Sequence, residues 1–187
     1  MGKGGAVLGL IGIILGAGGI AFGYFIWIGQ NNNLTQPKVV GVWDGLTRNT
    51  DYPGFDQTHT WLFEFTDNEF NNSVYISVSN NNTRITLLKP GWYRIHLSAL
   101  LNGLEPSNGF SQRYFIALLK DNSLIEYLYS LWTPSGSKGF NNVDSSTLVN
   151  SDGANYIEIR GTSSPQDDFN IYSTDSFNRF SIEFVST

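Results

Sequence analysis

Residues 92–99 read WYRIHLSA, and the character of their side chains alternates along the segment. A period of two is typical of a β-strand that has one buried face and one exposed face. The preceding pair, Pro90–Gly91, predicts a tight turn into this strand. The alternation predicts a buried face of Tyr93, Ile95, Leu97 and Ala99 and an outward face of Arg94, His96 and Ser98.

Similar segments recur through residues 39–187, separated by turns that are rich in Gly, Asn and Pro. A near-continuous apolar run at 113–119 predicts a central strand. Long polar loops are expected at 48–60 and 133–144. About ten short strands at such spacing predict an all-β antiparallel sandwich. The expected strands are 39–43, 61–65, 74–78, 83–88, 93–99, 113–119, 124–132, 146–149, 156–160, 169–172 and 179–185.

Four of these segments resemble motifs of one family, the C1q/TNF-like jelly rolls. Residues 83–96 (TRITLLKPGWYRIH) are similar to the family's central motif, in which a strand runs into Pro-Gly, an aromatic pair and an alternating strand. Residues 116–122, 148–159 and 176–184 are similar to later strands of the family. The resemblance covers residues 39–187. It implies a jelly roll of about ten strands, assembly as a homotrimer and binding through exposed loops.

The N-terminal part of the chain has a different composition. Residues 4–37 carry no charged side chain, and residues 7–28 are all apolar or glycine. As a helix, the apolar run matches the hydrocarbon core of a bilayer, which is about 30 Å thick. We therefore expect one transmembrane helix, with a membrane anchor at 1–29, a polar linker at 30–38 and the jelly roll at 39–187.

Glycines recur in this span at alternating intervals of three and four residues, which is a heptad with glycine at both seam positions. Small residues let membrane helices approach closely, so the stripe predicts a helix-packing seam that faces another copy or another protein. The alternative is that glycine is merely common in membrane segments. The family's collagen-like stalk is absent, and the seam could take its place in assembly. The seam consists of Gly2, Gly5, Gly9, Gly12, Gly16, Gly19 and Gly23.

The orientation of the anchor follows from its flanking charges. Lys3 and the amino terminus are the only charges before the span, so the positive-inside rule keeps the N-terminus cytoplasmic and exports the domain. Two processing alternatives remain: a signal-peptidase site at Ala21–Gly23, and Lys3–Gly4 as a site like that of archaeal type IV pilins. All three interpretations place the domain outside the cytoplasm.

Composition excludes several functional classes. The net charge is -5 and no basic patch exists, which argues against a nucleic-acid partner. Cysteine is absent, so the chain has neither disulfides nor thiol chemistry. We find no catalytic motif, and His59 and His96 are the only histidines. We therefore expect a protein that is not an enzyme and needs no metal or cofactor.

Two weaker ligand hypotheses concern loop carboxylates and tryptophans. Asp51, Asp56 and the pair Asp167–Asp168 could hold calcium, although a solvated acidic loop is the favoured interpretation. The second hypothesis is that three tryptophans form a sugar-binding platform. The favoured interpretation is that they pack in the core or at a subunit interface. The tryptophans concerned are Trp43, Trp92 and Trp132.

Three sequons at Asn33, Asn71 and Asn81 are candidate N-glycosylation sites in an exported chain. Plain polar turns are the alternative interpretation.

The sequence as a whole predicts a membrane-anchored extracellular domain that acts in binding, adhesion or surface assembly. Candidate subunit-interface residues are Trp92, Tyr75 and His96, because a monomer would expose them. The expected partners are further copies of the chain, most simply as a homotrimer, the membrane, and surface glycans or proteins. The alternative is a structural subunit of a surface filament or coat, pilin-like or viral, and a secreted enzyme or lectin ranks lower.

Overall fold

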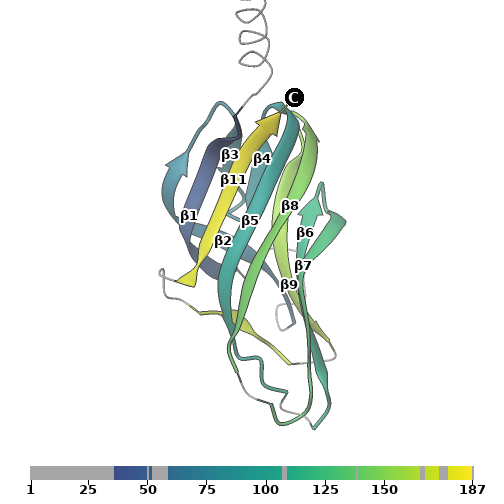
Figure 1. The fold of residues 1–187 in the computed structure, drawn as a ribbon. Coiled ribbons are helices and arrows are strands. Elements are labelled where there is room, and N and C mark those ends of the chain that lie inside the picture. Colours follow the sequence, from purple (N-terminus) through teal and green to yellow (C-terminus); the bar gives the residue numbers. More distant parts are fainter. Residues whose placement is uncertain are drawn as a thin grey trace, which may run out of the picture. The chain divides into compact units, whose positions relative to one another are not determined.

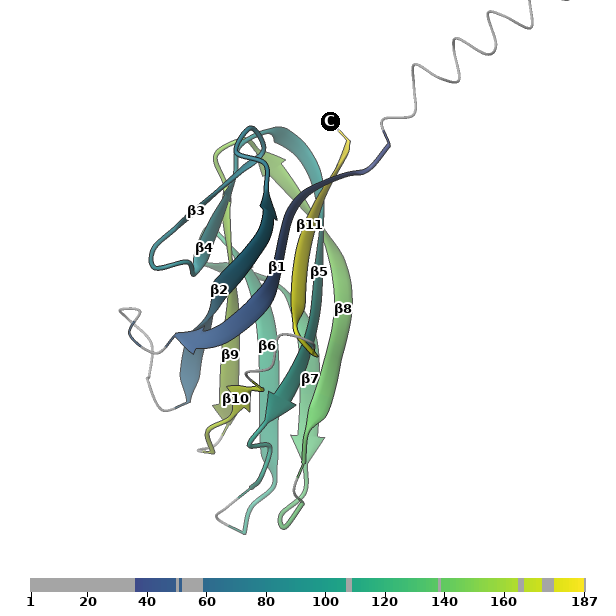
Figure 2. The ribbon, with the colours of Figure 1, turned by 90° about the vertical axis from the view of Figure 1, so that its left-hand side faces the viewer.

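The computed structural model describes residues 36–49, 51, 59–106, 109–137, 139–164, 167–172 and 177–186. These residues form eleven β-strands that pack as an antiparallel sandwich of two layers (Figures 1 and 2). Within these ranges the structure has no α-helix. The described residues therefore contain no helix that could cross a membrane. The predicted anchor with its glycine seam, and Asn33, lie outside the described residues.

One layer, here called the front sheet, faces the viewer in Figure 1. Its order is β8-β5-β11-β1-β2, and β10 (Asn170–Ile171) pairs with the end of β5. Neighbouring strands of the front sheet run antiparallel to one another. The bounds of the sheet's strands are β1 (Lys38–Asn49), β2 (Thr60–Asn71), β5 (Pro90–Asn102), β8 (Asn141–Asp152) and β11 (Arg179–Ser186).

The other layer, the back sheet, has the order β7-β6-β9-β4-β3. The start of β2 also pairs with β9 over Thr60–Leu62, so the hydrogen-bonded ladder passes from one layer to the other on that side. The chain alternates between layers from β5 to β6 and from β8 to β9, which is the winding of a jelly roll. The strands are β3 (Ile76–Ser79), β4 (Arg84–Leu87), β6 (Gln112–Lys120), β7 (Ser123–Thr133) and β9 (Tyr156–Ser164).

Aromatic side chains fill the space between the layers. Trp43 of β1 packs against Phe65 and Phe180, with ring centroids 5.7 Å from each. Toward the other end of the sandwich, Phe169 lies 5.2 Å from both Trp61 and Tyr114. A chain without disulfides depends on such a core, because burial of apolar surface is the main favourable term in folding.

The expected alternation at 93–99 is confirmed, since Tyr93, Ile95, Leu97 and Ala99 are buried. The expected central position of residues 113–119 is also confirmed, because β6 pairs with β7 on one side and β9 on the other.

The strand expected at 39–43 is longer than predicted, because Asp44–Gly45 is not a turn. β1 continues to Asn49, and Gly45 lies where β2 comes close. A Cβ at Gly45 would stand 2.9 Å from the backbone carbonyl carbon of Thr66. The glycine therefore permits close strand pairing here rather than breaking the strand.

Pro90–Gly91 was also expected as a turn, and instead it begins β5. Gly91 has φ of 139°, a conformation that side chains disfavour, and a Cβ there would meet the carbonyl oxygen of Ser186 in β11 at 2.3 Å. The glycine is required by the approach of β11.

Two further expectations on the back half of the chain need correction. The loop at 133–144 is shorter than predicted, because β8 already begins at Asn141 with polar side chains directed outward. The alternation of Tyr156, Glu158 and Arg160 with Ile157 and Ile159 predicts that Glu158 is exposed, but it is only 1% exposed. Arg84 lies 2.9 Å from its carboxylate and covers it, which allows a charge to be buried at this position.

Candidate binding surfaces

The outer side of the front sheet, here called the front face, carries exposed apolar side chains. Trp92 of β5 is 44% exposed and Leu148 of β8 is 49% exposed. Leu148 pairs with Arg94, two residues from Trp92 on the same side of β5, so the two apolar side chains are diagonal neighbours. Val39 and Phe70 are likewise exposed on β1 and β2. Isolated exposed apolar residues are ordinary, but a set on one face is typical of an interaction surface.

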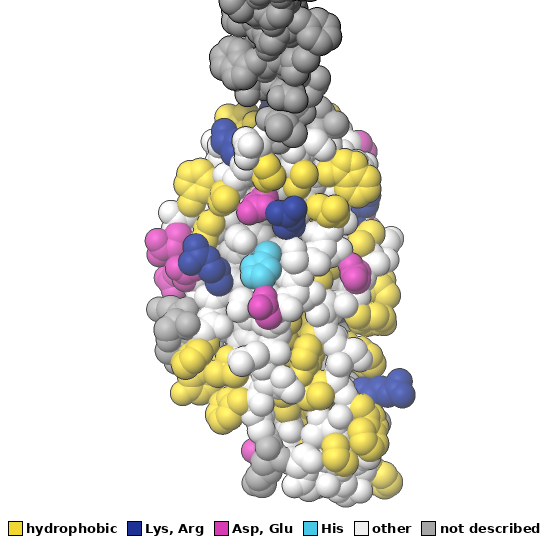
Figure 3. Space-filling view, in the orientation of Figure 1, with side chains coloured by type: hydrophobic (Ala, Val, Ile, Leu, Met, Phe, Trp, Pro, Cys, Tyr) yellow, Lys and Arg dark blue, Asp and Glu magenta, His cyan; other side chains and the backbone are white. Residues whose placement is uncertain are grey.

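Charged pairs occupy the centre of the front face, with hydrophobic side chains above and below them (Figure 3). Arg94 lies 2.8 Å from Glu183 across the β5–β11 pair. His96 Nε2 and Asp144 Oδ1 are 3.5 Å apart. Such exposed pairs contribute little to stability, about 0–1 kcal/mol each. At this position the pairs fix where positive and negative groups lie on the front face.

A shallow hollow of about 460 Å³ lies at this charged centre. Arg179 Nε and Asp44 Oδ1, 3.8 Å apart, stand on its β11 and β1 side. The hollow opens on the same face as Trp92, so any partner that covers the front face would meet it. It is lined by Asp44, His96, Ser98, Asp144, Phe177, Asn178 and Arg179.

The three candidate interface residues do not share one surface. Trp92 and His96 lie on the same side of β5, as strand periodicity requires. Tyr75 precedes β3 and is partly buried, with its ring 5.1 Å from that of Phe184 and the Lys38 Nζ 4.9 Å from its ring centroid. The expectation that a single subunit would leave Tyr75 exposed is therefore wrong, because the rim of the core covers it.

A second hollow, of about 230 Å³, lies beside the connection between β7 and β8. Trp132 and Phe140 line it and are 57% and 63% exposed. Phe140 also belongs to a row of aromatic rings. Its centroid lies 5.5 Å from Tyr172, which lies 6.0 Å from Phe177 at the front-face hollow. We call this site the β7–β8 hollow.

The three tryptophans considered for a sugar platform are separated in the structure. Trp43 is buried in the core, which confirms the packing interpretation for that residue. Trp92 lies on the front face and Trp132 at the β7–β8 hollow.

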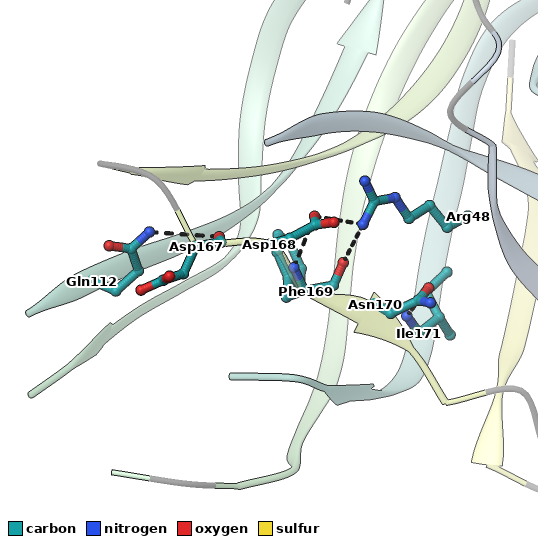
Figure 4. Close-up of polar contacts among 7 residues, drawn as sticks. All are labelled: Arg48, Gln112, Asp167, Asp168, Phe169, Asn170 and Ile171. Carbon is teal, nitrogen blue, oxygen red and sulfur yellow. Dashed lines mark hydrogen bonds and ion pairs between the residues drawn. The ribbon is translucent and has the colours of Figure 1, made fainter. Parts of the chain in front are cut away.

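The acidic segment before β10 has a structural explanation (Figure 4). Arg48 of β1 places Nη1 2.5 Å from Asp168 Oδ1 and donates a hydrogen bond to the carbonyl oxygen of Phe169 at 3.0 Å. Gln112 Nε2 donates to the Asp167 carbonyl oxygen at 3.5 Å. These contacts hold Phe169 over the end of the core.

Arg48 already forms an ion pair with Asp168, so it would compete with a calcium ion for this carboxylate. Asp51 donates its backbone N–H to Asn49 Oδ1, and Asp56 lies outside the described residues. Among the residues placed by the structure, no group of three or more His, Cys, Asp or Glu could hold a metal ion.

The sequence did not predict several of the buried polar groups that the structure contains. The Arg84 guanidinium, paired with Glu158, also stacks 3.8 Å from the centroid of Tyr156. Burial raises the pKa of Tyr114 to about 12, with Asp167 and Glu105 adding to the effect, and burial also raises the pKa of Tyr129 to about 12. The two tyrosines are neutral at physiological pH and support packing rather than chemistry.

The acceptor asparagines of the two sequons within the described part of the chain are both exposed, although Thr83 of the second sequon is buried. Asn71 ends β2, and Asn81 lies in the turn between β3 and β4 with φ of 52°. Their modification stays a prediction.

Comparisons with known proteins assign the chain to no family. No family model matches the sequence, and no curated protein matches it. Among solved structures, the chain is similar to murine APRIL at pH 5.0, with a TM-score of 0.47 and 8% identity over 80% of this chain and 99% of that one. It is also similar to GITRL from pika, with a TM-score of 0.41 and 14% identity over 81% and 98% of the two chains. Both are TNF-family ligands. The jelly-roll fold of this chain rests on its own strand order.

Proposed function

We propose that this protein is an extracellular binding subunit that is anchored in a membrane by residues 1–29 and assembles as a homotrimer through its front face. The observation that carries the proposal is the exposure of Trp92 and Leu148 side by side on that face. The sequence resemblance to C1q/TNF-like domains supplies the number three. A closed cyclic assembly needs only one repeated interface, so a single face on each subunit is sufficient.

The apolar area at Trp92 is large enough to matter for assembly. With 44% of a tryptophan exposed, about 110 Å² of a side chain of about 250 Å² remains to be buried. At about 25 cal/mol per Å², this contributes about 3 kcal/mol for each subunit that covers the ring. The charged centre would then fix register and exclude other partners, as charges at interfaces commonly do.

Light scattering on the fragment 37–187 tests the assembly. We expect three times the subunit mass at micromolar concentration, and Trp92→Asp should yield the monomer because the interface would have to bury a carboxylate. Trp132→Asp is the matched control: Trp132 is also exposed but lies outside the front face. A wild-type monomer would refute assembly through the front face and leave association to the glycine seam.

A protease test addresses the predicted topology. Protease added to intact cells should remove the domain and leave the anchor behind, because Lys3 keeps the N-terminus inside. A domain that is protected until the cells are lysed would overturn the proposed location.

A further inference from the structure

We propose that the β7–β8 hollow is a binding site for a neutral glycan. The proposal goes beyond assembly, because the site is built within one subunit. Its volume of about 230 Å³ suits a small ligand unit rather than a protein segment. The described residues that line it are Leu104, Leu131, Trp132, Thr133, Pro134, Ser137, Gly139, Phe140 and Asn141.

The described lining combines aromatic rings with uncharged polar side chains, which favours a sugar over a purely apolar ligand. None of the described lining residues carries a charge, although the chain as a whole is acidic. Trp132 and Phe140 offer exposed aromatic surface, onto which the C–H face of a pyranose ring can pack. Ser137 and Asn141 add a hydroxyl and an amide that can exchange hydrogen bonds with sugar hydroxyls.

An unsatisfied hydroxyl gives independent support. Thr133 lines the hollow and is only 8% exposed, and among the described residues its Oγ1 has no hydrogen-bond partner. A buried polar group without a partner keeps its full desolvation penalty, which is larger than the net contribution of an ordinary hydrogen bond. A ligand hydroxyl that pairs with Thr133 would remove this cost, whereas a purely apolar ligand would not.

The surroundings of the hollow are suited to more than one sugar unit. The aromatic row continues from Phe140 through Tyr172 to Phe177, with centroids 5.5 and 6.0 Å apart. The connection beyond Trp132 is shaped by a turn in which the Ser137 N–H donates to the Pro134 carbonyl oxygen at 3.2 Å. A shaped loop lowers the cost of ordering on binding. An oligosaccharide could therefore occupy the hollow with one unit and extend along the row.

The test is binding of the full-length chain to an array of neutral mono- and oligosaccharides built from glucose, galactose, mannose and their N-acetylamino forms. We expect a subset to bind. Trp132→Ala and Phe140→Ala should each weaken binding about tenfold or more, because an aromatic anchor dominates the affinity of a small site. Thr133→Val keeps the shape and removes the hydroxyl, and it should also weaken binding.

Tyr127→Ala is the matched control, because Tyr127 is an exposed aromatic on the same strand but outside the hollow. It should bind as the wild type does, and unchanged melting temperatures show that each variant is folded. Binding of the best glycan in solution should survive Trp92→Asp, which separates this site from the proposed assembly. No binding on the array, or binding that Trp132→Ala and Phe140→Ala leave unchanged, overturns the proposal.

Discussion

Replacing Gly91 by alanine should destabilise the domain, because Gly91 combines a disfavoured backbone conformation with a close backbone contact. The backbone at Gly91 has φ of 139°, and a Cβ would stand 2.3 Å from the carbonyl oxygen of Ser186 and 2.9 Å from the ring of Phe184. The first contact is with backbone, which cannot rotate away. β11 would therefore have to move away from the start of β5.

The expected loss follows from two separate penalties. A side chain in a disfavoured backbone conformation costs about 1–3 kcal/mol. Forcing an extra methyl into a packed site typically costs about 1–3 kcal/mol more. We therefore expect the free energy of unfolding to fall by at least about 2 kcal/mol, which lowers the melting temperature of a domain of this size by about 4–8 °C or more.

The assay is thermal unfolding of the fragment 37–187, followed by circular dichroism, with two glycine controls. Gly136 has φ of 79° but nothing within 4 Å of its added Cβ, so Gly136→Ala carries the conformational cost alone, about 1–2 kcal/mol. Gly139 has open space and no unusual φ, so Gly139→Ala should be neutral. If Gly91→Ala melts within about 1 °C of Gly136→Ala, the close approach of β11 does not constrain this position and the reasoning is wrong.

Three further predictions concern the core, pH and the anchor. Phe169→Ala should lower the free energy of unfolding in urea by about 3–5 kcal/mol, because the ring is buried between the aromatic side chains at one end of the core. The domain should lose stability as pH rises from 10 to about 12. The reason is that Tyr114 and Tyr129 have pKa values of about 12 in the folded state and about 10.0 in the unfolded state, so deprotonation favours unfolding over this range. The double variant Tyr114→Phe with Tyr129→Phe should flatten this part of a plot of unfolding free energy against pH. Gly12→Leu with Gly16→Leu should weaken self-association of the N-terminal span in a membrane assay, and unchanged association would mean that the glycine period is incidental.

The parts of the fold that could be predicted from sequence are those set by local alternation. The buried face of residues 93–99 follows from the period alone, and so does the presence of Trp92 and His96 on one side of β5. Local patterns failed where a distant segment decides the outcome. Gly91 looked like a turn residue because the approach of Ser186 is invisible in the sequence, and Glu158 looked exposed because its partner, Arg84, lies 74 positions away.

The candidate sites show the same limit. Trp132 stood out as a tryptophan in the sequence, but its hollow forms only where the end of β7, the start of β8 and Leu104 after β5 come together. Tyr75 stood out as an aromatic residue that a monomer would expose, but the ring of Phe184 partly covers it. A strand period gives the side of a sheet on which a residue lies, but not which loops meet at the sheet's end.

The position of β11 has a consequence for when this domain can fold during its synthesis. β11 lies between β5 and β1, and both pairings involve most of its length. Until residues 179–186 have emerged, the front sheet is split into two parts with bare edges, and β1 lacks one of its two neighbours. A ribosome-bound intermediate therefore has all the strands of the back sheet but no complete front sheet to pack on it. A chain that crosses a membrane in an extended form would stay competent for translocation until β11 had passed, and would then complete its fold on the far side.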